Sequence, residues 1–468
     1  MAFASVSFLS VFLPVTFLIC VLCCRWVRVQ NACLLAASLF FYAWGDAGNV
    51  LLLIACGFAN HFFAVSMNWA EQENRRKRML FASVAFNMLM LFGFKYAGFA
   101  VQSINALLGL QLPVPQIALP LGISFFTFQG MSYVLDVYRR KTEPAPSGLS
   151  VLLYLALFPQ LIAGPIVKWQ RMAGQLAQRS ITAEGAAAGL RRAAFGLAKK
   201  VLLADTLGRV VDLAFSAPVA GLSAPLAWLG AFAHTLQIYL DFSGYSDMAI
   251  GLGLMLGFTL PENFALPLCA DTMRHFWQRW HITLTDWFRE YFYDPLGGSR
   301  KHAARNLMLV FLFTGLWHGA NVTFVVWGIY HGLFVMAEHF GWLPVKRFSR
   351  VLRSLYVLMV TVIGFVIFRA DSLSQAGAYL SGMLRFAPMD ALQYSYLCEA
   401  LSLSRICMLL AAIPVCFAGK RLFGGKLNAK LDGSRMQWLG YLAAFVLICL
   451  SYASLLATGY HPFLYFRF

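Results

Sequence analysis

An all-α, polytopic membrane protein is the fold class that the sequence predicts, from its composition, its long apolar runs and the placement of its charges. Of the 468 residues, 60% are hydrophobic and 12% are charged, and the mean hydropathy is +0.67. Soluble domains carry about 25% charged residues, so this chain lies outside their range. Since no polar linker or internal repeat divides the apolar runs, we expect one integral membrane domain over residues 1–468.

Apolar runs near the bilayer-crossing length of about 20 residues recur along the chain. They cover residues 5–24, 48–69, 79–96, 117–136, 149–167, 226–258, 306–340, 355–369, 402–418 and 437–457, and the shorter stretch 31–46 is counted as a crossing when the charges are placed. The runs 226–258 and 306–340 are too long for one perpendicular crossing at about 1.5 Å per residue, so each should hold two helices or a re-entrant segment. The whole pattern then predicts about 11 membrane helices.

The net charge of +17 would favour a nucleic-acid partner in a soluble protein, but its distribution argues against one. Basic clusters at residues 25–28, 75–78 and 139–141 fall between apolar runs, and two crossings separate each cluster from the next. All three therefore lie on one side, which the positive-inside rule identifies as the cytoplasm. We expect an N-terminus outside, a first run retained as a helix, and no nucleic-acid partner.

The stretch 268–305 is too charged for an exposed span and too aromatic for a solvated loop. Its Trp277, His281, Leu284 and Phe288 recur at helical spacing on one face. We therefore expect a buried or interfacial helix here, sheltered by the rest of the protein.

Two carboxylates, Asp241 and Asp247, stand in the apolar run 226–258, where each costs about 2.5–3.5 kcal/mol on insertion scales. Asp241 lies one turn from Tyr245, and Ser243 lies one turn from Asp247. Two interpretations stay open: the carboxylates lock helices together through hydrogen bonds, or they line a polar cavity.

His318 stands in an unusual setting, "FTGLWHGANVTF", within the apolar run 306–340. Gly315 and Gly319 flank it and permit close approach of a backbone or a ligand, and Asn321 adds a polar group. A neutral imidazole in a dry site can accept a proton from a hydroxyl. The alternative is a structural histidine that only donates a hydrogen bond. A hairpin broken at residues 319–321 and a continuous tilted helix both fit the run.

His281 and His331 are the next candidates for chemistry among the nine histidines. The chain holds no HExxH, no two CxxC motifs that could form a metal site together and no Walker loop, so we expect neither a metal site nor nucleotide hydrolysis. The ten cysteines show no paired spacing and are expected to be apolar filler.

Several long blocks resemble one family in their order along nearly the whole chain. They are "LPLGISFFTFQGMSYVLDVYR" (119–139), "FPQLIAGPI" (158–166), "YLDFSGYSDMAIGLGLMLGF" (239–258), "ENF…FWQRWHITLTDWFREYFYDPLGGSR" (262–300) and "GLWHGANVTFVVWGIYHG" (315–332). The chain thereby resembles the membrane-bound O-acyltransferase (MBOAT) family, and most closely its branch of bacterial alginate O-acetyltransferase membrane subunits.

That resemblance implies a ring of membrane helices around a thinned centre, with a tunnel that brings acyl donor and acceptor together. The family carries one histidine in its FWxRWH block and one in its WHG block, here His281 and His318. By this likeness His318 is the principal catalytic residue and His281 its partner. Further residues of the shared motifs are expected to support the tunnel: Asp241, Ser243, Tyr245, Asp247, Trp317, Asn321 and His331.

The function implied is passage of an acetyl group from cytoplasmic acetyl-CoA across the bacterial inner membrane. The acceptor would be a cell-surface polysaccharide (alginate-like, cellulose or peptidoglycan), with a separate extracytoplasmic partner protein completing the transfer. No bound cofactor is expected, since acetyl-CoA is a substrate. Its phosphates would lie near basic residues that the positive-inside bias explains equally well: Lys168, Arg171, Arg191, Arg192, Lys199 and Lys200.

Two alternatives stay open. The acyl group could be another one, such as D-alanine passed from a carrier protein to teichoic acid. A transporter or channel would also place Asp and His within the membrane.

The aromatic C-terminus, "YHPFLYFRF", is expected outside, as an interfacial anchor or part of a docking surface.

Overall fold

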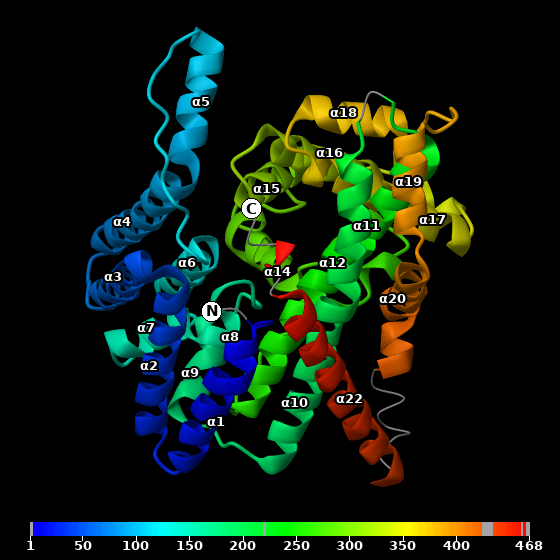
Figure 1. Cartoon of the computed structure of the whole chain (residues 1–468). Coiled ribbons are helices and arrows are strands. Elements are labelled where there is room, and N and C mark those ends of the chain that lie inside the picture. Colours follow the sequence, from blue (N-terminus) through cyan, green and yellow to red (C-terminus); the bar gives the residue numbers. More distant parts are fainter. Residues whose placement is uncertain (1–2, 219–220, 424–433, 460–461, 465–468) are drawn as a thin grey trace. The chain divides into compact units, whose positions relative to one another are not determined.

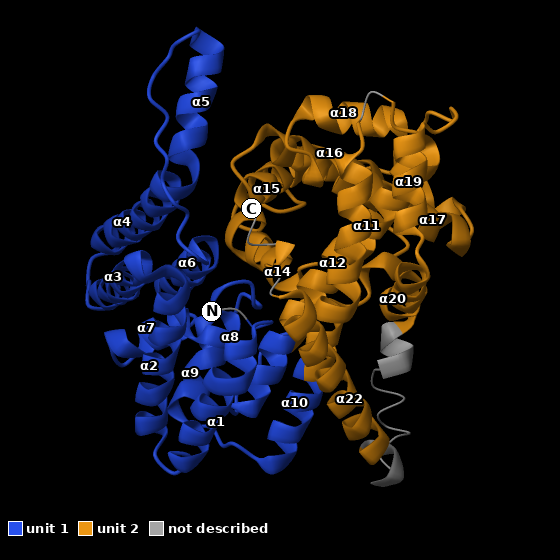
Figure 2. Cartoon of the chain, in the orientation of Figure 1, with its two compact units in different colours: residues 1–193, 248–261 blue, residues 194–247, 262–468 orange. Residues whose placement is uncertain are grey.

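The structure is a computed structural model that describes residues 3–218, 221–423, 434–459 and 462–464. Every regular element in these residues is helical, which confirms the all-α prediction (Figure 1). The chain divides into two compact units (Figure 2): unit 1 holds residues 1–193 and 248–261, and unit 2 holds residues 194–247 and 262–468. Two boundaries fall within the helices α10 (Ala183–Ala198) and α12 (Ala224–Met255), and the third follows Pro261. The expected single domain stays a prediction.

Unit 1 is built mainly from the N-terminal helices. These are η1 (Phe8–Phe12), α1 (Leu13–Leu22), α2 (Val27–Asp46), η2 (Ala47–Asn49), α3 (Val50–Asn68), α4 (Glu73–Leu91), η3 (Phe92–Tyr96), α5 (Ala97–Leu108), α6 (Ile123–Tyr138), α7 (Gly148–Ala156), α8 (Phe158–Leu161), α9 (Trp169–Ala177) and most of α10 (Ala183–Ala198). Asn60 of α3 and Asn87 of α4 exchange side-chain hydrogen bonds of 3.2 and 2.9 Å. Buried amide pairs of this kind fix the packing of apolar helices.

Unit 2 holds the remaining helices and the candidate site. They are η4 (Lys199–Ala204), α11 (Asp205–Ser216), most of α12 (Ala224–Met255), η5 (Pro267–Cys269), α13 (Met273–Trp277), α14 (Ile282–Phe288), η6 (Arg289–Tyr293), α15 (Ala303–His318), α16 (Val322–His339), η7 (Val345–Arg347), α17 (Arg350–Arg369), α18 (Leu373–Gly382), α19 (Ala391–Ala400), α20 (Leu403–Phe423) and α22 (Ser434–Thr458).

Several helical stretches are long and apolar enough to cross a membrane. Within the described ranges four of them qualify by length and composition: Val27–Asn68, Glu73–Leu108, Arg350–Arg369 and Trp438–Thr458. The bent pair Ala391–Ala400 and Leu403–Ala418, at 60°, would add a fifth. These stretches support a multi-pass membrane protein, while about 11 membrane helices in a ring with a tunnel stay a prediction.

The run 306–340 forms two helices, as expected. α15 ends at His318 and α16 begins at Val322, where the side chain of Asn321 accepts a hydrogen bond of 3.1 Å from the Thr323 backbone N–H. The two helices pack closely because glycines face the partner backbone. A Cβ at Gly315 would lie 2.3 Å from the Phe324 carbonyl oxygen. The hairpin therefore holds His318 at a fixed bend.

The expectation of two helices or a re-entrant segment in the run 226–258 was wrong. α12 continues unbroken for 32 residues, or about 48 Å at 1.5 Å per residue. The length of the run suggested a break, but length alone does not interrupt a helix whose residues all continue the hydrogen-bonded backbone. Its two carboxylates also have cationic partners, because Asp241 pairs with Lys200 and Asp247 pairs with Lys199.

The expectation of a single helix in the stretch 268–305 was also wrong. α13 ends at Trp277 and α14 starts at Ile282, and His281 between them has a left-handed backbone with φ of +43°. The Ile282 backbone N–H donates to the Asn263 carbonyl oxygen at 2.9 Å, so the chain turns at His281 against a distant segment. Side-chain spacing could not reveal this contact.

Candidate active site

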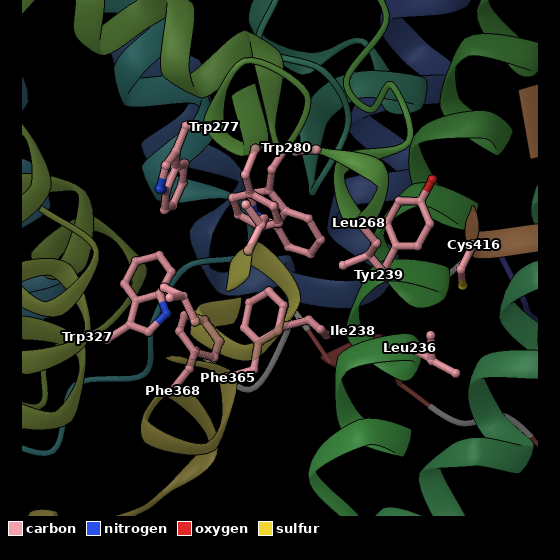
Figure 3. Close-up of a cluster of buried hydrophobic side chains, with 14 of the residues drawn as sticks. Leu236, Ile238, Tyr239, Leu268, Trp277, Trp280, Trp327, Phe365, Phe368 and Cys416 are labelled. Atoms are coloured by element: carbon pink, nitrogen blue, oxygen red, sulfur yellow. The ribbon is translucent and has the colours of Figure 1, made fainter. Parts of the chain in front are cut away.

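A cavity in unit 2 combines an apolar wall with two ionisable side chains. It encloses about 390 Å³ of space free of protein atoms, its open mouth included. Figure 3 shows much of the aromatic wall, including Trp280, Trp327, Phe365 and Phe368. The full lining is Ile238, Asp241, Phe242, Trp280, His318, Trp327, Phe365, Phe368 and Leu464. Small-molecule sites commonly have this character, mostly apolar with a few placed polar groups.

His318 reaches the cavity from the last position of α15, with only 5% of its surface exposed. Its ring centroid lies 5.1 Å from that of Trp327 and 5.3 Å from that of Phe368, both in edge-to-face contact. The next residue is Gly319, where a Cβ would lie 2.1 Å from the Phe324 ring. Aromatic side chains thus surround the imidazole and exclude most water from it.

Trp317 lies between the two histidines of the predicted pair. Its ring centroid is 5.7 Å from that of His281 and 5.0 Å from that of His318. His281 itself is not part of the cavity lining. The structure therefore gives the two histidines a common neighbour and places only His318 at the cavity wall.

Asn263 holds His281 in one orientation, a role that the sequence did not reveal. The Asn263 Oδ1 atom lies 3.1 Å from His281 Nδ1 and accepts a hydrogen bond of 2.9 Å from the Thr283 hydroxyl. Because an amide oxygen only accepts, Nδ1 carries the proton and Nε2 carries the lone pair. His281 lies outside the helices long enough to cross a membrane, and burial lowers its pKa to about 3. Nε2 meets no hydrogen-bond partner in the described residues, so it is a neutral, available acceptor.

Asp241 belongs to a buried charge cluster at the edge of the cavity. Its Oδ1 lies 2.8 Å from Lys200 Nζ, and the same ammonium lies 2.6 Å from Asp205 Oδ1. The Lys200 side chain is only 2% exposed. Asp241 therefore joins two segments through an ion pair, and it also lines a cavity, although that cavity is mostly apolar and not the polar one considered from the sequence.

The chain end packs against this cluster. The Leu464 backbone N–H donates to Asp241 Oδ2 at 2.9 Å, and Lys200 Nζ donates to the Pro462 carbonyl oxygen at 3.3 Å. The Phe463 ring meets Tyr245 edge-on, with centroids 4.8 Å apart. Residues 462–464 therefore contact buried charges through their backbone, while residues 460–461 and 465–468 lie outside the described residues, so the interfacial anchor and the docking surface both stay predictions.

Asp247 and Lys199 form a second ion pair of 2.6 Å near the first. Lys199 and Lys200 are two of the basic residues near some of which the CoA phosphates are expected. The Lys200 side chain is buried against carboxylates, so the other basic residues are the better candidates. Ser243, on the same helix as Asp247, is buried outside the cavity wall.

Asn321 and His331 also lie outside the cavity wall. Asn321 caps α16 and donates to the Asp371 carbonyl oxygen at 3.0 Å, which is a structural role. His331 is buried and packs on Trp327 with ring centroids 5.0 Å apart. Across the described parts of the chain, no group of three or more His, Cys, Asp or Glu side chains could hold a metal ion.

The chain is similar to known proteins along most of its length. The model of the membrane-bound O-acyltransferase family matches residues 34–367. The chain is 36% identical to a probable alginate O-acetylase AlgI of Pseudomonas putida, over 100% of both proteins. It is 40% identical to that of Pseudomonas aeruginosa, over 82% of this chain and 75% of the relative. A peptidoglycan O-acetyltransferase of Helicobacter pylori is 30% identical, over 98% of this chain and 96% of the relative.

Proposed function

The chain belongs to the membrane-bound O-acyltransferase family, and from that premise we propose that it passes acetyl groups from cytoplasmic acetyl-CoA to a cell-surface polysaccharide. O-acyl transfer is the activity of the family, and the names of full-length relatives support O-acetylation of a polysaccharide. The observation that carries the proposal is the position of His318, which is enclosed by aromatic rings and lines the cavity together with Asp241.

His318 acts as the general base in this proposal. A nitrogen of its imidazole takes the proton of the acceptor hydroxyl while that oxygen attacks the thioester carbonyl carbon. The C–O bond forms, the C–S bond breaks, and the CoA thiolate leaves and receives the proton from the imidazolium. General-base catalysis of this kind contributes about 10²–10⁴-fold. His281, through its lone pair on Nε2, positions the donor or a water molecule.

The proposal places the protein in the bacterial cytoplasmic membrane, with the donor inside and the polysaccharide outside. An extracytoplasmic partner protein then completes the transfer to an alginate-like polymer, cellulose or peptidoglycan. The relatives support this choice of acceptors, because their names refer to alginate and to peptidoglycan.

The test uses purified protein in nanodiscs, supplied with the extracytoplasmic partner and its polysaccharide. Radiolabelled acetyl-CoA and carrier-bound D-alanine are offered in separate reactions. The proposal predicts that label from acetyl-CoA appears in the polymer. If label reached the polymer from the D-alanyl carrier and not from acetyl-CoA, the transferred group would be D-alanine and the proposed acetyl donor would be wrong. If a substrate crossed the membrane and no acylated product formed, the protein would be a transporter.

A further inference from the structure

Trp327 lines the cavity, and its indole N–H is a buried donor. The side chain is 1% exposed and lines the cavity together with His318. Its Nε1 atom has no hydrogen-bond partner within the described ranges. Leaving a buried donor unsatisfied costs about 1–3 kcal/mol, so such a group calls for an explanation.

Packing fixes the orientation of the Trp327 ring. His331 and Trp277 contact it with ring centroids 5.0 and 5.7 Å away, and Phe368 lies 5.1 Å away at the cavity. In Figure 3 the Trp327 nitrogen lies on the side of the ring that faces Phe368. The N–H group is therefore held in place before any substrate arrives, which is what a preorganised donor requires.

Trp327 and His318 are carried by the same hairpin. α15 ends at His318, and α16 presents Trp327 about one and a half turns after its first residue. A Cβ at Gly328 would lie 2.3 Å from the Phe311 carbonyl oxygen, so the two helices are as close as glycine permits. The rings of His318 and Trp327 consequently stay 5.1 Å apart.

The 5.1 Å between the rings of His318 and Trp327 allows the two side chains to contact different atoms of one acyl-transfer reaction. Attack on a thioester places negative charge on the carbonyl oxygen, and that charge needs a donor about 2.7–3.1 Å away. The attacking hydroxyl needs a base within about 2.6–3.2 Å. Trp327 can only donate, because an indole N–H has no acceptor function. It therefore complements the imidazole of His318 and cannot replace it as the base.

We propose that Trp327 is a catalytic residue whose indole N–H donates to the oxyanion formed during acyl transfer. The inference rests on the proposed function, since it needs a thioester donor in this cavity. As the acceptor oxygen attacks, the carbonyl C=O π bond opens and its electron pair moves to the oxygen that Trp327 stabilises. That pair returns to the carbonyl when the C–S bond breaks. Any acyl thioester forms the same oxyanion.

The test compares Trp327→Phe, which removes the N–H and keeps an aromatic ring, with Trp228→Phe as a control. Trp228 also lies in unit 2, and its indole nitrogen donates to the Met383 carbonyl oxygen at 2.9 Å. Trp228 does not line the cavity. Loss of one oxyanion donor predicts a fall of about 10²–10³-fold in kcat for Trp327→Phe, with little change in KM. For Trp228→Phe we expect a kcat close to that of the wild type.

Equal losses of kcat in both variants would show a packing role for Trp327 and overturn the inference, as would a wild-type kcat in Trp327→Phe. Binding of a non-reactive thioether analogue of acetyl-CoA, measured in parallel, verifies that the variants keep a folded site. If the wild type transfers no acetyl group, acetyl-CoA is not the donor and the proposed function is wrong. The kcat values of the tryptophan variants can then be compared with a carrier-bound acyl thioester, which still tests the role of Trp327.

Discussion

Replacement of Lys200 by methionine should destabilise unit 2 strongly. The ammonium of Lys200 lies 2.8 Å from Asp241 and 2.6 Å from Asp205, and the three groups are largely buried. Methionine has a similar length but no charge, so both carboxylates would lose their cation. Two facing carboxylates without a cation must take up a proton or admit water.

The expected loss in the free energy of unfolding follows from the burial of the Lys200 ion pairs. Removal of one partner of a buried ion pair costs about 3–5 kcal/mol, because the charge that remains is uncompensated. Lys199 provides a matched control, since it pairs with Asp247 at 2.6 Å but keeps 22% of its side chain exposed. Solvent screens such a partly exposed pair, so Lys199→Met should cost no more than about 1 kcal/mol.

Unfolding in mixed detergent micelles, titrated with a denaturing detergent, measures both variants against the wild type. Adding Asp241→Asn to Lys200→Met should restore part of the lost stability, because one uncompensated carboxylate disappears. The reasoning is refuted if the Lys200 and Lys199 variants lose the same free energy, or if the double variant is less stable than Lys200→Met alone.

Two further variants test the site. Asn263→Asp places a carboxylate beside Nδ1 of His281, which stabilises the protonated imidazolium and should raise the pKa of His281 from about 3. The acid limb of the pH–rate profile should then move towards neutral pH. An acid limb at the wild-type pH would contradict this. Leu464→Ala enlarges the cavity, so the ratio of kcat/KM for butyryl-CoA to that for acetyl-CoA should rise about tenfold or more. Leu236→Ala, buried away from the cavity, should leave that ratio unchanged, and equal ratios in the two leucine variants would exclude the chain end from the acyl pocket.

The sequence predicted the helical class and two features of the site. Gly319 and Asn321 after His318 made a hairpin one of the two arrangements left open, and the structure shows the hairpin. Asp241 stood out because a carboxylate in an apolar helix needs a partner or a cavity, and it has both. Such signals are local, so they can be read from a few consecutive residues.

Other parts of the site depend on contacts between distant segments and left no local signal. Asn263 turns the chain at His281 from 18 positions away. Leu464 reaches the cavity only because its backbone binds Asp241, which is 223 positions away. Trp327 resembled the other aromatic residues of an apolar helix until the structure placed its side chain in the cavity wall and its N–H among buried donors without a described partner.

The central claim is that His318 is the base of an acyl transfer. The most direct measurement is the transfer of radiolabelled acetyl groups by wild type, His318→Gln and His234→Gln in nanodiscs. His234 is also buried in unit 2 and contacts Gln237 at 3.3 Å, but it does not line the cavity. We expect His318→Gln to lower kcat by about 10²-fold or more and His234→Gln to transfer acetyl at nearly the wild-type rate. Wild-type turnover by His318→Gln would contradict the claim and leave that histidine a structural role.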